Sequence, residues 1–210
     1  MDFILSYYYL GGWVANLCII PARGGSKRIP KKNIKEFLGK PIISYSIHIA
    51  LECGLFDEVM VSTDDCEIRV IAKQFGASVP FMRSKKNSDD FANTMDVISE
   101  VSKNYEQKFG MNFQYICCVY ATAPLIQSAD LIVAYKALQT SKWDYVFAST
   151  EYPYPIQRSF RMRQNGSVDM FCPEKYFERS QDLEKAYHDA GQFCWGKAEA
   201  WLEGRIVFSE

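Results

Sequence analysis

The residues best suited to chemistry lie between Arg23 and Lys35, directly after a short apolar run. Six basic side chains occur there, at positions 23, 27, 28, 31, 32 and 35, interleaved with Gly24, Gly25 and Ser26. Glycine lets a backbone pass close to a ligand and expose its N–H groups. Lysine and arginine neutralise phosphate oxygens. The spacing therefore predicts a strand followed by a loop that holds the phosphates of a nucleotide.

Two familiar phosphate-binding patterns are absent from this stretch. It contains neither G-x-x-x-x-G-K-[ST] nor G-x-G-x-x-G, which mark the P-loop and the dinucleotide-binding fold. A basic cluster alone is most often a solvated face and sometimes a nucleic-acid patch. The interleaved glycines and prolines disfavour a plain helical stripe and favour one shaped loop.

The composition limits the class of protein. The 210 residues are 48% hydrophobic and 23% charged, with a net charge of −1, which predicts one globular domain and disfavours nonspecific nucleic-acid binding. The seven cysteines form no C-x-x-C pair, so we expect buried thiols in a reducing compartment, the cytoplasm. Residues 1–16 lack a basic signal-peptide start and are too short to cross a bilayer. We interpret them as an N-terminal extension and expect no membrane partner.

Apolar runs alternate along the chain with segments of helical spacing. We expect strands at 17–20, 58–63, 115–120 and 144–149. We expect helices from Pro41 to Gly54, from Asp65 to Gly76, from about Met95 to Gln107, and from a capping Ser128 to about Ser141. This order predicts an α/β fold with a doubly wound, mostly parallel sheet.

Two acidic residues, Asp64 and Asp65, follow the second predicted strand. Paired carboxylates in that place could hold Mg²⁺. They could also cap the next helix and complement its dipole, which is the interpretation we favour. A polar stretch from Arg83 to Thr94 follows the run Val79-Pro80-Phe81. We expect it to be a loop at the carboxyl end of a strand, where doubly wound sheets bind ligands.

The spelling I-P-A-R-G-G-S-K-R-I-P-K-K-N, from Ile20 to Asn33, covers fourteen contiguous positions. It resembles the opening motif of the nine-carbon acid-sugar cytidylyltransferases, the CMP-sialic acid synthetase family. The resemblance extends from Leu17 to about Phe208. It implies a Rossmann-like nucleotidyltransferase fold and an enzyme that joins CTP to an acidic nine-carbon sugar with release of pyrophosphate.

The resemblance also assigns nucleotide-binding positions. Arg23 and Lys27 match the catalytic cradle for the leaving pyrophosphate, together with the amides of residues 24–26. Arg83 and Thr94 match an arginine and a hydroxyl that contact the cytidine. The full implied set is Ala22, Arg23, Gly24, Gly25, Ser26, Lys27, Lys32, Asn33, Arg83 and Thr94.

The sugar-binding positions depart from the sialic acid pattern. Tyr120 stands where those enzymes carry glutamine, and residues 188–191 read His-Asp-Ala-Gly. The chain is more similar to the branch that activates pseudaminic acid. The implied sugar contacts are Tyr120, Gln157, Arg179, His188, Asp189 and Gln192. Open alternatives are a sialic or legionaminic acid substrate, UTP or GTP in place of CTP, and a relic that binds nucleotide without turnover.

Two further expectations concern assembly and metal. The proline-rich segment 151–185 is rich in aromatic residues and matches a family arm, so we expect a homodimer built around it. The family requires Mg²⁺ and binds it through an Asp-x-Asp pair near the C-terminus, which this chain lacks. We therefore leave the metal ligands unassigned and expect that the chain is truncated, with Val207 and Phe208 beginning a strand, or that Asp64 or Asp65 binds the metal.

Overall fold

A five-stranded sheet in the order β4-β1-β5-β9-β6 organises the computed structural model, which describes residues 15–89 and 92–208. Its strands are β1 (Asn16–Pro21), β4 (Glu58–Ser62), β5 (Tyr115–Val119), β6 (Tyr145–Glu151) and β9 (Tyr187–Lys197). Strand β1 pairs in parallel with β4 and β5, as predicted, whereas β9 pairs antiparallel with β5. The sheet is therefore mixed, and β9 was not predicted as a strand. Residues 1–14 of the predicted extension lie outside the described residues.

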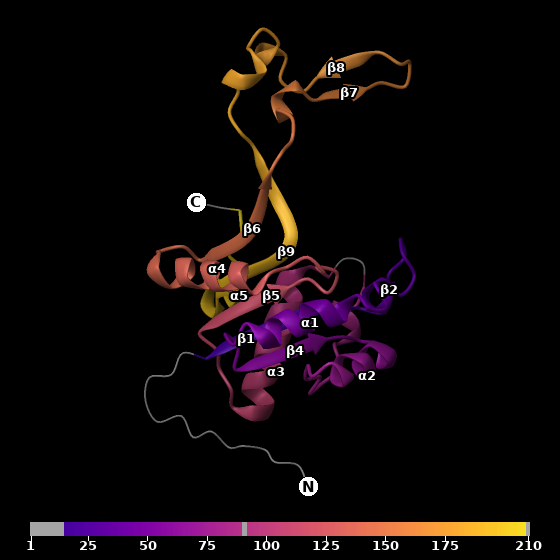
Figure 1. Cartoon of the computed structure of the whole chain (residues 1–210), viewed down its shortest axis with the longest axis vertical. Coiled ribbons are helices and arrows are strands. Elements are labelled where there is room, and N and C mark those ends of the chain that lie inside the picture. The colour runs from indigo at the N-terminus through magenta and orange to yellow at the C-terminus, as the bar shows by residue number, and fades with distance from the viewer. Residues whose placement is uncertain (1–14, 90–91, 209–210) are drawn as a thin grey trace. The chain divides into compact units, whose positions relative to one another are not determined.

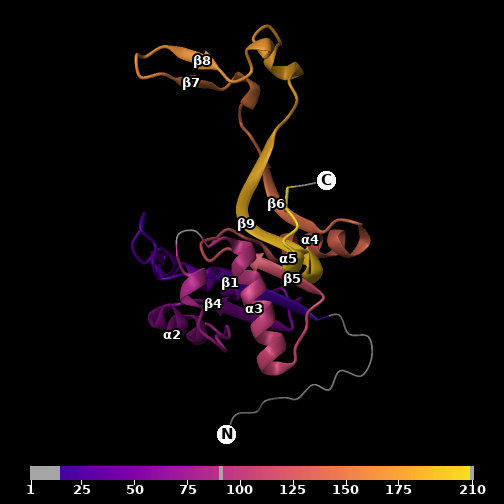
Figure 2. The same ribbon diagram turned by 180° about the vertical axis from the view of Figure 1, so that it is seen from behind.

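Helices cover both faces of this sheet (Figures 1 and 2). They are α1 (Ile43–Glu52), α2 (Cys66–Gln74), α3 (Thr94–Phe109), α4 (Ser128–Thr140) and α5 (Ala198–Glu203). The two views agree that α1 and α4 lie on one face and α3 and α5 on the other. Because strand residues point alternately to opposite faces, Leu17, Ile19, Ile116 and Cys118 share one core with α3 and Trp201. This burial on both faces explains the near-continuous apolar runs of β1 and β5.

Two predicted helix starts were wrong. Pro41 belongs to β3 (Lys40–Pro41), which pairs with β2 (Glu36–Phe37) in a small hairpin, so α1 begins only at Ile43. Ser128 is the first helical residue of α4 rather than its cap, and the preceding Gln127 makes no side-chain cap bond. The prediction for α3 was correct apart from one or two residues at each end. Its capping box joins the side chain of Asn93 to Asp96, a detail that the sequence analysis did not identify.

The predicted strand before the Arg83 loop is reduced to a single bridge. Ser78 alone bridges to Met60, and its backbone bonds to Val59 and Val61 cover the outer edge of β4. The following Pro80 has no N–H to donate, which is consistent with a ladder that ends there. The polar loop therefore follows an edge-covering segment instead of a full strand.

A second compact unit comprises Ala148–Gly191, slightly longer than the arm predicted at 151–185. It contains the hairpin of β7 (Phe160–Met162) and β8 (Val168–Met170). The predicted Asn165-Gly166 turn is confirmed, with Gly166 at a positive φ of 81°. Asp169 bonds Arg163 at 3.0 Å and lies 3.3 Å from Arg161. The described part of this unit has short strands and 3-10 turns but no α-helix, which explains its weak sequence pattern.

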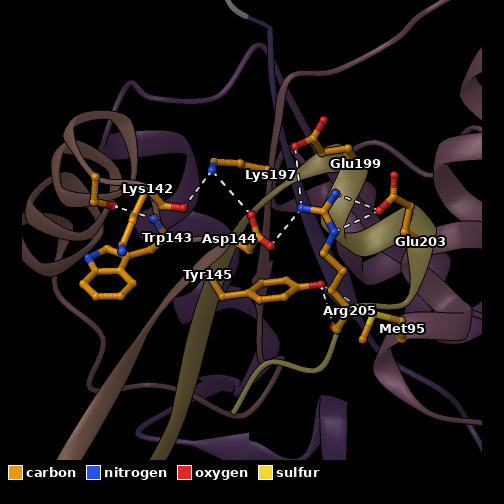
Figure 3. Close-up of polar contacts among 10 residues, drawn as sticks. Met95, Lys142, Trp143, Asp144, Tyr145, Lys197, Glu199, Glu203 and Arg205 are labelled. Atoms are coloured by element: carbon orange, nitrogen blue, oxygen red, sulfur yellow. Dashed lines mark hydrogen bonds and ion pairs between the residues drawn. The ribbon is translucent and has the colours of Figure 1, made fainter. Parts of the chain in front are cut away.

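A polar network joins α5 and the residues after it to the start of β6 (Figure 3). Arg205 bonds the Asp144 carboxylate at 2.8 Å and the Glu203 carboxylate at 2.7 Å, and the Tyr145 hydroxyl donates to the Arg205 carbonyl at 3.0 Å. Lys197 lies 3.4 Å from the other Asp144 oxygen. Val207 and Phe208, predicted to begin a strand, lie in a turn beyond this network.

This network predicts a pH-dependent contribution to stability. The hydrogen bond from Arg205 lowers the pKa of Asp144, so Asp144 stabilises the fold above its unfolded pKa of about 3.9 and loses that effect as pH falls through its folded pKa. Arg205→Ala should therefore lower Tm at pH 7 by on the order of 1–3 °C, and by less at about pH 3, which is below the unfolded pKa. Thermal unfolding followed by circular dichroism at both values would check this. An equal Tm loss at both values would contradict it.

Candidate functional site

The glycine loop is attached to the carboxyl end of β4 and the residues after it by two hydrogen bonds. The Ala22 amide donates to the Ser62 carbonyl at 2.9 Å, and the Gly24 amide donates to the Asp64 Oδ1 atom at 2.9 Å. Parallel strands end at the same edge of a sheet, which brings the two segments together although they are about forty residues apart. The predicted binding loop therefore lies where an α/β sheet holds its ligands.

The two glycines of the loop have different surroundings. A Cβ on Gly24 would lie 2.6 Å from Asp65 Oδ2 and 2.9 Å from Asp65 Cβ, whereas a Cβ on Gly25 would meet nothing within 4 Å. Asp65 cannot easily move, because its carboxylate caps α2 by accepting the amides of Glu67 and Ile68. The capping interpretation is thus confirmed for Asp65, and it also explains why residue 24 is glycine.

The far end of the basic loop is fixed by polar contacts. Asn33, which is buried, donates its side-chain amide to the Arg23 carbonyl at 2.9 Å. Lys31 adopts a left-handed conformation with φ of 51° and lies 2.6 Å from the Glu67 carboxylate of α2. Between these anchors, Gly25 and Lys27 are exposed and Lys32 is half-buried. The loop therefore presents its backbone and a cation to solvent while both of its ends are held.

Arg83 is a buried cation at the same end of β4. Its side chain is 8% exposed, and its guanidinium bonds Ser62 Oγ at 3.0 Å and the Ser62 carbonyl. Its own amide bonds the Thr63 carbonyl at 2.8 Å. Burial lowers the pKa of Arg83, and the neighbouring Asp64 carboxylate partly offsets this effect. An arginine with these shifts stays charged at neutral pH, so a positive charge is fixed beside the loop.

The segment after Arg83 connects to both the loop and α3. The Arg23 guanidinium donates to the Asp89 carbonyl, and Ser84 bonds Glu100 of α3 through its amide at 2.7 Å and its hydroxyl at 2.6 Å. Thr94, predicted to contact the nucleotide, is the first residue of α3. The structure thus bonds Gly24 and Arg83 to residues 62–64 and Asn33 to the Arg23 carbonyl, whereas no bond given for the described residues joins Thr94 to them.

The predicted amide cradle is only partly available in this structure. The Gly24 amide is bound to Asp64, and the Ser26 amide donates to the Gly24 carbonyl at 2.9 Å. Sequence reasoning considered Asp64 only as a cap or a metal ligand and missed its bond to the loop. It also missed Ser62, which orients both Ala22 and Arg83. The signal for Asp64 was its place directly after a strand, whereas nothing in the sequence distinguished Ser62.

Two of the predicted sugar contacts lie beside each other: Tyr120 directly follows β5, and Gln192 lies within β9. The Tyr120 amide donates to the Gln192 carbonyl at 2.9 Å, so the antiparallel pairing of β5 and β9 brings the two residues opposite each other. Ser46 of α1 fixes Tyr120 by donating its hydroxyl to the Tyr120 carbonyl at 2.8 Å. These two positions are therefore neighbours across the β5–β9 pair, at the carboxyl end of β5.

The other four predicted sugar contacts belong to the unit Ala148–Gly191. Arg179 bonds the Asp182 carboxylate at 2.6 Å, and the Gln157 amide donates to the Glu184 carbonyl at 3.0 Å. The His188 ring packs against Tyr152 with ring centroids 4.7 Å apart. Asp189 accepts the Gly191 amide at 2.8 Å. None of the four lines the unit's pocket of about 440 Å³, which lies among residues 151–155, 180, 181 and 183–186.

The donor set for a metal ion is sparse. Among residues 15–89 and 92–208 there is no group of three or more His, Cys, Asp or Glu side chains that could hold a metal. All seven cysteines lie in this part of the chain and are thiols. The prediction that they are buried is confirmed for Cys18, Cys117, Cys118 and Cys194, but Cys53 and Cys172 are only half-buried and Cys66, at the start of α2, is exposed. In the same residues, no helix is long and apolar enough to cross a membrane.

The chain is similar to known cytidylyltransferases. A family model described as cytidylyltransferase matches residues 17–197. The chain is 50% identical over 193 residues to a pseudaminic acid cytidylyltransferase of Campylobacter jejuni, covering 92% of this chain and 83% of that protein. It is 36% identical over 200 residues to a CMP-N,N'-diacetyllegionaminic acid synthase of Legionella pneumophila, with the same coverage of 92% and 83%.

A solved structure resembles the chain in fold. The structure of CMP:2-keto-3-deoxy-manno-octonic acid synthetase complexed with CTP superposes with a TM-score of 0.67 and 17% identity, covering 93% of this chain and 79% of that chain. Identity at this level supports the shared architecture alone. The predicted α/β nucleotidyltransferase fold is therefore confirmed.

Proposed function

This chain belongs to the cytidylyltransferase family, and we propose that it transfers CMP from CTP to pseudaminic acid and releases pyrophosphate. The observation that carries the proposal is the 50% identity to a pseudaminic acid cytidylyltransferase over 92% of the chain. The anchored, cation-flanked loop at the end of β4 is the supporting feature of the structure.

In the proposed reaction the anomeric hydroxyl of the sugar attacks the α-phosphorus of CTP. The bond from that phosphorus to the bridging oxygen breaks, pyrophosphate leaves, and the hydroxyl proton is lost. Catalysis of this kind depends mostly on positioning and on neutralising charge. We assign Arg23 and Lys27 to the leaving pyrophosphate and Arg83 to the nucleotide. Arg179 is assigned to the sugar carboxylate, which a guanidinium fork suits.

Pyrophosphate release is the direct test of this proposal. It would be measured with CTP, UTP, GTP and ATP, each combined with pseudaminic, legionaminic and N-acetylneuraminic acid. We expect turnover with CTP and the highest kcat/KM for pseudaminic acid, since specificity is that ratio. Equal kcat/KM for all three sugars would refute the substrate assignment. Nucleotide binding without release for any pair would identify a non-catalytic relative.

We also propose that the enzyme is a homodimer assembled through the unit Ala148–Gly191. Phe160, Met162, Tyr176 and Phe177 of this unit are 55%, 74%, 57% and 92% exposed. Such a concentration of exposed apolar side chains is typical of an interaction surface. Light scattering at micromolar concentration should give twice the chain mass, and Phe177→Asp together with Met162→Asp should shift the protein towards monomer. The exposed substitution Val70→Asp on α2 is the control. A monomeric wild-type protein would contradict the proposal.

We further propose that turnover depends on Mg²⁺. Proteins bind this ion through one or two carboxylates together with substrate phosphates, so the three-ligand cluster that the described residues lack is not required. Asp64, beside the loop, is the carboxylate available for it. Bound on the triphosphate, Mg²⁺ supplies charge neutralisation. Pyrophosphate release should rise and saturate as Mg²⁺ is titrated and should stop in EDTA. Undiminished turnover in EDTA would disprove this dependence.

The thiol state of all seven cysteines is consistent with a reducing compartment. On that basis we propose the cytoplasm as the location of the enzyme. Retention of activity after incubation with a thiol reductant is the expected result, whereas inactivation by the reductant would oppose this location.

A further inference from the structure

The Asp64 carboxylate occupies a place that a phosphate would suit. It accepts the backbone N–H of Gly24 at 2.9 Å. Backbone amides of glycine-rich loops are phosphate donors in nucleotide sites, and a carboxylate oxygen accepts the same hydrogen bond as a phosphate oxygen. In the unliganded protein this donor is therefore already bound to an anion that the chain itself provides.

Two arginines lie beside the same place. Arg23 precedes Gly24 in the loop, and the backbone of Arg83 bonds Thr63, the residue before Asp64. Burial of Arg83, whose side chain is 8% exposed, makes a nearby counter-charge favourable. The Asp64 charge is close enough to oppose the burial-induced lowering of the Arg83 pKa. Together with Glu100, which also opposes the lowering of the Arg83 pKa, Asp64 thus partly balances the charge of two arginines.

We propose that Asp64 is an internal anion that fills one phosphate position of the empty nucleotide site and is displaced from the Gly24 amide when a phosphate binds. This inference rests on the proposed function, because it requires the loop to be the phosphate site. Asp64 is exposed, so its side chain can turn into water without leaving a buried charge. Its neighbour Asp65 remains in place as the cap of α2. The contact prevents stray anions from occupying the site and keeps the loop ordered while it is empty.

The proposal makes an unusual prediction: removing this charge strengthens binding. In Asp64→Asn the Gly24 amide keeps an acceptor, but the hydrogen bond loses its ionic character and the repulsion of an incoming phosphate disappears. Charge-assisted hydrogen bonds are roughly twice as strong as neutral ones. We therefore expect Asp64→Asn to bind inorganic pyrophosphate and CTP in EDTA with a Kd lower by roughly fivefold.

Asp65→Asn is the matched control. It removes the same charge one residue away, it does not involve the bond to Gly24, and asparagine retains N-cap ability. Titration calorimetry of the full chain in EDTA should show its Kd within about twofold of wild type. Circular dichroism would verify that both variants are folded, which the exposure of Asp64 favours.

Four other outcomes would each overturn the inference. Weaker binding by Asp64→Asn would mean that the carboxylate helps to hold the ligand. Equal tightening in both variants would mean general repulsion rather than occupation of a phosphate position. If neither the wild type nor either variant binds pyrophosphate or CTP, the proposed function is refuted together with this inference. If the wild type binds normally and the Kd of Asp64→Asn is unchanged, only the inference is refuted.

Discussion

Gly24→Ala is expected to lower kcat/KM for CTP by about 100-fold, the scale of loss that a displacement of roughly 1 Å at a reacting group produces. The added Cβ would lie 2.6 Å from Asp65 Oδ2 and 2.9 Å from Asp65 Cβ. Since Asp65 is held by the amides of Glu67 and Ile68 at 2.7 and 3.1 Å, the loop has to move instead. Its bond from Gly24 to Asp64 would break with that movement.

Gly25→Ala is the control for this prediction. A Cβ at residue 25 meets nothing within 4 Å, and its φ is not among the positive ones, so we expect kcat/KM within about threefold of wild type. Steady-state pyrophosphate release at saturating sugar, with thermal unfolding to verify the fold, would compare the two variants. Similar losses for both would mean that the loop tolerates no side chain anywhere. Full activity of Gly24→Ala would show that Asp65 gives way.

Arg83→Ala should reduce both CTP affinity and stability. The substitution removes the guanidinium that bonds the Ser62 hydroxyl and carbonyl, and it leaves a cavity at a position that is 8% exposed. We expect a loss of about 2–3 kcal/mol in the free energy of unfolding. CTP binding should weaken by at least about tenfold, because a hydrogen-bonded cation contributes roughly 1.5 kcal/mol or more.

Two companion variants separate charge from geometry in this prediction. Arg83→Lys keeps the charge but cannot reproduce the guanidinium fork, so it should recover part of the CTP affinity and little of the stability. Arg69→Ala, on the exposed face of α2, should change neither property. Urea unfolding and calorimetric CTP titration would provide the two readouts. Normal CTP affinity in Arg83→Ala would assign Arg83 a purely structural role.

The bonds around Ser62, Thr63 and Asp64 connect these predictions. Residues 62–64, at the end of β4, bond the glycine loop and Arg83. They also lead into Asp65, the cap of α2, which leaves no room for a side chain at Gly24. Changes at these positions are therefore close enough to couple. We expect the effects of Gly24→Ala and Asp64→Asn on pyrophosphate affinity to be non-additive, because both alter the hydrogen bond between the Gly24 amide and residue 64.

The sequence by itself determined those features whose signals are local. The phosphate loop was predicted because its glycines and basic residues are contiguous, and α3 because its buried residues Val97, Ile98, Val101 and Tyr105 recur at helical spacing. The cap of α2 was predictable from Asp65, since a capping carboxylate bonds amides only two and three residues ahead. The Asn165-Gly166 hairpin turn was also predictable, because its signal is a pair of adjacent residues.

Only the tertiary structure decided the features that join distant segments. The antiparallel insertion of β9 beside β5 depends on a pairing of residues about eighty apart, for which no local pattern exists. The burial of Arg83 against Ser62 and the bond from Gly24 to Asp64 arise because separate strand ends meet at one edge of the sheet. Propensity and spacing describe residues that are neighbours along the chain, whereas the charge balance around the glycine loop is set by residues that are neighbours in space. The bond from Asp64 to the loop could therefore be seen only in the folded protein.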